Sequence, residues 1–211
     1  MKKLVLVLAA ALVSLMAVAQ TPEEILEKMD QTMNQGENEG MAMTMTMKIP
    51  ILGAFDTHVW TLGEKSRAET QMKGDKLVMW EDGINVWTYK SSDNEITIEE
   101  SKADHSSDAE EGLDILDGIS EGYDFSIQKE TEDTWFILCK KRKDNPNKDD
   151  PKKIELSVAK DTYILREMKT GMSGVTMIMK DFVFGVTEAD VTFDPARYPD
   201  AKIVDKRGEE K

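Results

Sequence analysis

Histidine and cysteine are sparse in this chain of 211 residues, and its 41 acidic residues are so many that no single carboxylate pair indicates acid/base catalysis. Its two histidines, His58 and His105, have no second histidine or cysteine at the spacing of metal ligands, so we predict no metal site. The Gly-Met-Ser-Gly segment 171–174 lacks the G-x-S-x-G spacing of a strained nucleophilic serine, and we interpret it as a hairpin turn. We therefore expect a protein that is not an enzyme and needs no cofactor.

Two further candidates for chemistry also have a structural explanation. A window of calcium-loop length runs from Asp144 to Glu155, but Asp149 stands where such a loop needs glycine and Lys148 where it needs a ligand. The single cysteine, Cys139, ends an apolar run, which predicts a buried, inert thiol. One cysteine cannot form an internal disulfide, so the fold must rest on its core.

Methionine is the residue type whose placement points to a function. Of 14 methionines, Met41, Met43, Met45 and Met47 stand at alternate positions, and Ile49 continues the series. Alternate residues of a strand share a face, so the five form one apolar stripe. Thioethers gain little strand propensity but give an adaptable lining for apolar partners. The stripe alone leaves a ligand lining and a plain core as equal alternatives. Four more methionines crowd the last long segments: Met168, Met172, Met177 and Met179.

The elements that position this stripe are predicted to be strands. Segments of period 2, separated by turn residues, predict about eleven strands. Their regular spacing favours one mainly β domain, a curved antiparallel sheet or barrel, over two domains. The predicted strands are 41–49, 54–62, 66–72, 76–81, 84–90, 95–100, 125–130, 134–142, 153–160, 163–170 and 175–186.

One predicted hairpin is apolar on both faces. The Asp-Gly pair at 82–83 predicts a two-residue turn that places Val78 opposite Trp87. Trp80 then shares their face, whereas Met79 lies on the other. A hairpin of this kind must be covered on both sides.

Two short helices are expected beside the strands. Thr21, Pro22 and Glu24 have the pattern of a capping box with proline at the first helical position. The helix that follows should end near residues 34–36, and a second should cover 113–119, after the aperiodic acidic loop 101–111. The first helix has an apolar stripe of Ile25, Leu26, Met29 and Met33, which must cover something apolar.

The N-terminus and the charge indicate export. Residues 1–19 combine Lys2 and Lys3, an apolar run and a small-x-small end, so we predict a cleaved signal peptide and a mature domain 20–211. No cysteine stands at the cleavage site, so we expect an unlipidated protein. The net charge of −14 argues against nucleic acid and against adsorption to an anionic membrane surface.

The run 77–89, a strand followed by Asp-Gly, three residues and then Trp-x-Tyr, resembles the outer-membrane lipoprotein carrier family, the LolA-like superfamily. The segments around it follow the same order as in the family: a signal peptide, an N-terminal helix, a strand pair, a strand with Arg67-Ala68-Glu69, and residues 203–207, which resemble the family's closing strand. This resemblance implies an incomplete barrel of about eleven strands, with short helices as a lid over an apolar cavity.

In that family the cavity receives the acyl chains of lipoproteins released at the inner membrane and carries them across the periplasm. The resemblance therefore implies a monomeric periplasmic carrier, with acylated lipoproteins, inner-membrane release machinery and an outer-membrane acceptor as partners. A lipid-binding or sensor protein that transfers nothing is the alternative. Arg67 matches an arginine that holds the lid through helix-end carbonyls, or else it is an exposed strand residue. We assign to the cavity lining Met41, Met43, Met45, Met47, Ile49, Trp80 and Trp87.

Overall fold

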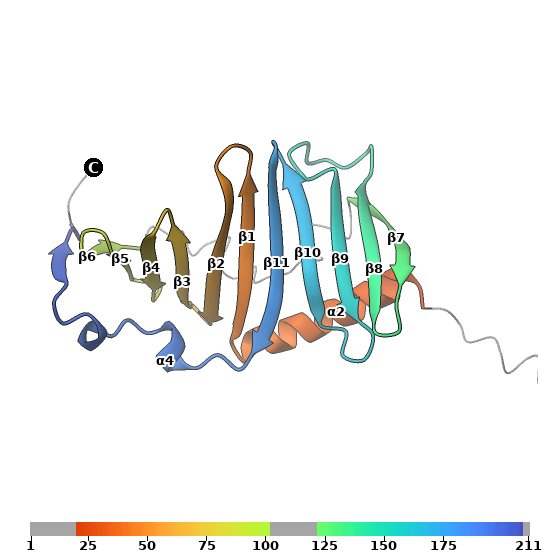
Figure 1. Ribbon diagram of the computed structural model, residues 1–211. Coiled ribbons are helices and arrows are strands. Elements are labelled where there is room, and N and C mark those ends of the chain that lie inside the picture. Colours follow the sequence, from red (N-terminus) through yellow and green to blue (C-terminus); the bar gives the residue numbers. More distant parts are fainter. Residues whose placement is uncertain (1–19, 102–121, 209–211) are drawn as a thin grey trace, which may run out of the picture.

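The computed structural model describes residues 20–101 and 122–208. Within these ranges the chain forms one bent sheet of 12 strands that does not close into a barrel (Figure 1). Neighbouring strands run antiparallel except for β12, which pairs with β6 in parallel. The predicted open antiparallel sheet is confirmed, with one short parallel strand added at its edge. The predicted signal peptide and the predicted helix 113–119 lie outside the described residues.

The strands follow one another in the sheet in the order β12-β6-β5-β4-β3-β2-β1-β11-β10-β9-β8-β7. Most predicted strands agree with the observed ones to within two residues. The strands are β1 (Met41–Ile49), β2 (Gly53–Leu62), β3 (Lys65–Met72), β4 (Asp75–Glu81), β5 (Asn85–Lys90), β6 (Glu95–Glu100), β7 (Tyr123–Glu130), β8 (Thr134–Lys141), β9 (Lys153–Ala159), β10 (Leu165–Met172), β11 (Val175–Phe184) and β12 (Lys202–Asp205). The helices are α2 (Pro22–Asn38), α4 (Glu188–Val191) and the 3-10 helix η1 (Pro195–Arg197).

The start of α2 is capped as the sequence predicts. The backbone N–H of Thr21 donates to Glu24 Oε2, and the backbone N–H of Glu24 donates to Thr21 Oγ1, each at 3.2 Å. The helix continues past Gly36, where a side chain would collide with the ring of Phe184. Its predicted apolar stripe is buried against β1 and β7 to β10. The shared core consists of Ile25, Leu26, Met29, Met33, Met41, Tyr123, Trp135, Ile137, Cys139, Ile154, Leu156, Val158 and Leu165.

Cys139 lies in this core, as predicted. Its side chain is fully buried, and burial raises the pKa of the thiol to about 12. The thiol is therefore protonated at neutral pH and a poor nucleophile.

The β4–β5 hairpin differs by two residues from its predicted register. Trp80 pairs directly with Trp87, whereas the prediction paired Trp87 two residues earlier on β4. Asp82 Oδ1 accepts hydrogen bonds from the backbone N–H groups of Ile84, at 3.0 Å, and Asn85, at 2.7 Å. These bonds widen the turn to four residues. A shift of two preserves the faces, so the predicted grouping of the two tryptophans is confirmed.

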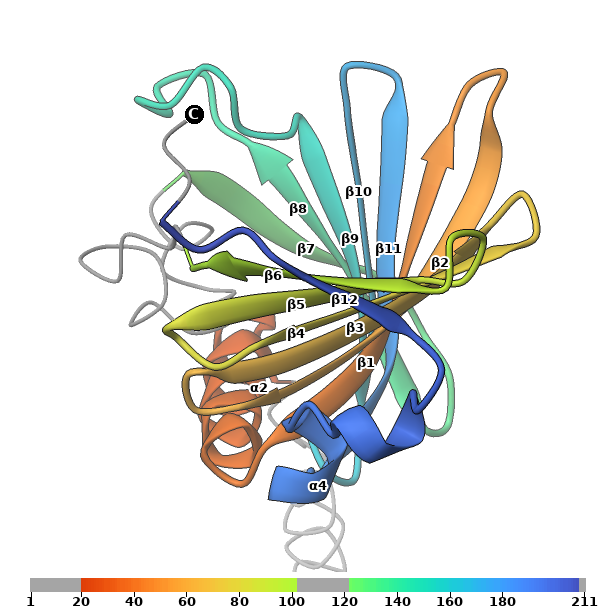
Figure 2. The same cartoon turned by 90° about the vertical axis from the view of Figure 1, so that its left-hand side faces the viewer.

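Strand register divides the sheet into two faces, because directly paired residues share a face. One chain of pairs runs Met43, Val59, Ala68 and Met79; this is the methionine face. The other runs Ala42, Trp60, Arg67, Trp80 and Trp87; this is the aromatic face. Helix α2 packs on the methionine face, and the C-terminal segment 187–201, with α4 and η1, packs on the aromatic face (Figure 2).

Candidate functional site

Methionines from three neighbouring strands lie side by side on the methionine face. Met45 of β1 pairs with Met179 of β11, which in turn pairs with Met168 of β10. Two residues further along β1 and β11, on the same face, Met47 pairs with Met177. Sheet register alone therefore builds a continuous thioether surface from strands far apart in the sequence.

The predicted stripe divides into a buried part and a half-buried part. Met41 is 1% exposed and belongs to the core beneath α2, and Met43 is 9% exposed. Met45 and Met47 are half-buried, as is Ile49. Within the described residues, Met41 belongs to the core cluster and Met168 is partly buried against it, whereas Met45 and Met47 belong to neither group. The structure thus places Met41 as a packing residue and leaves the later methionines at a partly open surface. The half-buried methionines Met45, Met47, Met177 and Met179 are called the methionine row below.

The apolar surface continues across the sheet to β4. Leu77 and Met79 lie on the methionine face and are exposed, and Val59 and Ala68 connect them to β1. An apolar surface that extends over several strands is typical of an interaction site. Neither Leu77 nor Met79 was assigned to the site from sequence, although the alternation in 77–80 had placed both opposite Trp80.

The structure does not bring Trp80 and Trp87 together with the methionines with which they were predicted to line a cavity. Both lie on the aromatic face, and Trp80 is only 2% exposed. The Trp80 ring meets Phe193 and Tyr198 edge-on, at centroid distances of 5.3 and 5.6 Å, and Trp87 stacks on Phe193 at 5.4 Å. The two tryptophans therefore anchor the C-terminal segment to the sheet.

Arg67 is also on the aromatic face, where it joins the sheet to α4. Its guanidinium lies over the rings of Trp60 and Trp80, at 4.7 and 6.0 Å from their centroids, and forms an ion pair with Glu69. Arg67 Nη1 donates to the carbonyl of Asp190 at 3.4 Å. Burial lowers the pKa of Arg67. The resemblance implied that Arg67 holds a lid, and the predicted lid helix 113–119 lies outside the described residues; the bond described here is to α4.

Of the two histidines considered for chemistry, the described one lies beside a threonine hydroxyl. His58 Nδ1 lies 3.2 Å from Thr44 Oγ1 on the aromatic face, and His105 lies outside the described residues. In ranges 20–101 and 122–208, no three His, Cys, Asp or Glu side chains are placed to hold a metal ion. Over the same ranges, no helix has the length and apolarity needed to span a bilayer. The site that this part of the chain offers is an apolar surface.

No family model and no curated protein matches this chain. Solved structures similar to it include LprF from Mycobacterium bovis, at 11% identity over 79% of this chain and 95% of that one, with a TM-score of 0.49. The lipoprotein LppX from Mycobacterium tuberculosis is 10% identical over 76% and 94%, with a TM-score of 0.47. A LolA superfamily protein from Nitrosomonas europaea is 12% identical over 83% and 99%, with a TM-score of 0.33.

Proposed function

We propose that the methionine face binds the acyl chains of lipoproteins and that the protein carries them through the periplasm toward the outer membrane. The observation that carries this proposal is the methionine row: Met45 pairs with Met179 and Met47 with Met177, all half-buried. Unbranched thioether side chains adapt to the shape of an apolar partner, which a carrier of different acyl chains needs.

The energetics of acyl transport fit such a surface. Each CH₂ group exposed to water costs about 0.8 kcal/mol, so several acyl chains can cross an aqueous space only under nearly complete cover. Helix α2 already fills the part of the methionine face over β7 to β10 with its own core. The part formed by β1, β11 and the strands toward β4 offers apolar side chains that this core does not use.

The remaining features fit a soluble shuttle. A mature chain that begins at Gln20 has no cysteine to acylate there and carries a strong negative charge, which opposes adsorption to anionic membranes. Its partners are acylated lipoproteins, the inner-membrane machinery that releases them and an outer-membrane acceptor. The resemblance of segment 77–89 to the lipoprotein carriers supports the same role.

A release assay tests the proposed function. Inner-membrane vesicles that bear a triacylated lipoprotein are energised and incubated with the protein, and the soluble fraction is separated. We expect a soluble one-to-one complex of lipoprotein and carrier, because the methionine face covers the acyl chains. Absence of release under every energised condition, together with a free lipid bound to the purified protein, would favour the binding protein that transfers nothing.

A further inference from the structure

Three neighbouring hairpins present apolar side chains at one end of the sheet. The β1–β2 tip exposes Ile51 fully and leaves Leu52 59% exposed. The β3–β4 and β10–β11 tips expose Met72 and Met172. These three hairpins are formed by consecutive strands, from β4 to β10 in the sheet order, and their tips lie at the upper end in Figure 1. Together the four side chains form an apolar edge, called the tip patch below.

The β1–β2 turn holds Ile51 in a left-handed conformation, as the turns of the other two hairpins hold Lys73 and Ser173, and what is unusual at Ile51 is the residue type. Ile51 has a φ of 73°, a left-handed conformation that a β-branched residue rarely adopts and that glycine or asparagine would take more easily. Because its side chain is fully exposed, Ile51 contributes nothing to the core. Strain of this kind is concentrated at functional positions, where another requirement selects the residue.

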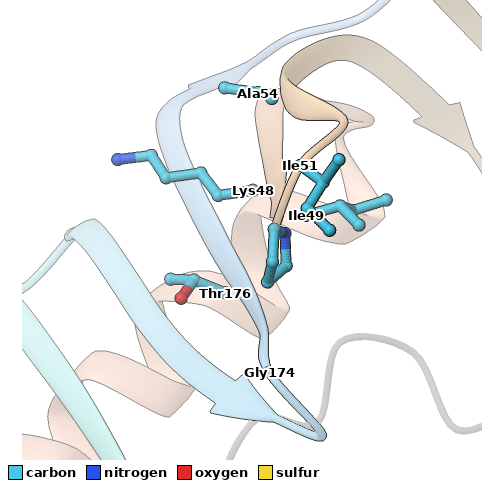
Figure 3. A pocket seen from close by; sticks show the side chains of 8 residues that line it. Lys48, Ile49, Ile51, Ala54, Gly174 and Thr176 are labelled. Atoms are coloured by element: carbon cyan, nitrogen blue, oxygen red, sulfur yellow. The ribbon is translucent and has the colours of Figure 1, made fainter.

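The charge around the tips is opposite to that of the whole chain. The turn segments 48–54, 71–76 and 170–176 carry Lys48, Lys73 and Lys76 but only one acidic residue, Asp75, in a protein with a net charge of −14. The β1–β2 and β10–β11 tips also enclose a shallow hollow of about 530 Å³, with Lys48, Ile49, Ile51 and Gly174 in its lining. The Lys48 side chain points away from those of Ile49 and Ile51 (Figure 3). Lys76 forms an ion pair with Glu69 at 3.0 Å, whereas Lys48 and Lys73 are exposed. Exposed apolar side chains near exposed lysines match a bilayer interface, where the acyl boundary lies beneath phosphate groups.

We propose that the tip patch docks on a lipid bilayer, with Ile51, Leu52, Met72 and Met172 inserted at the acyl boundary and Lys48 and Lys73 facing lipid phosphates. This docking site does not depend on acyl-chain binding by the methionine face. It would nevertheless set the end of β1, where the methionine row finishes, against the membrane. Apolar insertion, rather than net charge, holds the protein there, because the chain as a whole is acidic.

Vesicle flotation tests the docking site. The protein is mixed with phosphatidylcholine vesicles, with and without phosphatidylglycerol, and the double variant Ile51→Asp/Leu52→Asp is compared with wild type. We expect wild type to float with both vesicles, and the variant to bind at least about tenfold more weakly, because two apolar side chains are lost from the acyl boundary. The matched control is Ile84→Asp, a change of the same type in a hairpin turn at the other end of the sheet, where Ile84 is 72% exposed. This control should bind as wild type does.

A second variant separates docking from folding. Ile51→Gly relieves the left-handed strain, so we expect a higher unfolding temperature together with weaker vesicle binding. If Ile51 were only a turn residue, stability would rise and vesicle binding would stay unchanged. Failure of wild type to float with either vesicle would overturn the proposal. So would a dimer in sedimentation velocity that Ile51→Asp/Leu52→Asp dissociates, because a second copy would then be the occupant.

The proposed docking site and the proposed acyl-binding face can be tested separately. A fluorescent fatty acid in vesicle-free buffer should bind equally to wild type and to Ile51→Asp/Leu52→Asp. Met179→Asp, on the methionine face, should lose the fatty acid but still float with vesicles. Loss of both properties in the tip variant would contradict a separate docking site.

Discussion

Replacing Met45 and Met179 together by aspartate should weaken acyl-ligand binding about 100-fold or more while the protein stays folded. The two side chains pair across β1 and β11 at the centre of the methionine row. Losing their contact with an acyl chain costs about 1.5 to 3 kcal/mol for each side chain, which gives this factor. Both residues are half-buried, so the new carboxylates can reach water in the empty protein. Titration with a fluorescent fatty acid measures the affinity, and circular dichroism the fold.

The control for this variant lies on β11, the strand of Met179. Ile178 is half-buried beside Met179 but belongs to the opposite face, so Ile178→Asp should leave the affinity near that of wild type. Met41→Asp provides the comparison for a core position, because Met41 is buried beneath α2 and a carboxylate there should be strongly destabilising. If Met179→Asp destabilised the protein as much as Met41→Asp does, the row would be core packing and no ligand site.

Trp80→Ala should lower the free energy of unfolding by about 3 to 5 kcal/mol, which is the usual cost of removing a buried tryptophan ring. Trp80 is nearly fully buried and meets Phe193 and Tyr198 of the C-terminal segment. Its loss leaves a cavity between this segment and the sheet, so we also expect faster trypsin cleavage after Arg197. Denaturant unfolding and timed proteolysis measure the two effects.

Trp87→Ala distinguishes the two faces. Trp87 is half-buried and stacks on Phe193, so its removal should destabilise the protein less than Trp80→Ala does. Because Trp87 is on the aromatic face, its removal should leave fatty-acid affinity unchanged. A marked loss of affinity in a folded Trp87→Ala protein would show that the tryptophans contact the ligand after all.

Local patterns in the sequence predicted most of the fold. The capping box at Thr21 fixed the start of α2, and alternation in 41–49 fixed the strand and the two faces of β1. The same rules missed α4 and η1, because helices of four and three residues show no periodicity. A signal was nevertheless present: Thr187 and Asp190 form a capping box, and Asp194 precedes a proline at the first helical position.

The composition of the candidate site was harder to predict than the strands. Which face a residue shares with β1 depends on the register of every strand pair between that residue and β1. An error of one residue in any of these pairs assigns the residue to the opposite face. Alternation in 77–80 separated Met79 from Trp80, but only the pairs from β1 through β4 show that Met79, and not Trp80, shares a face with Met43. The same holds for Met177 and Met179, which reach β1 through a pairing between residues far apart in the chain.

Native mass spectrometry of the protein, gently purified from cells that produce it, tests the central claim most directly. The spectrum records which molecules remain on the chain without assuming what they are. We predict a one-to-one complex with an acylated lipoprotein in wild type, and its loss in Met45→Asp/Met179→Asp. A wild-type spectrum that contains only the bare chain, with neither lipoprotein nor lipid, would contradict the assignment of the methionine face as an acyl-binding site.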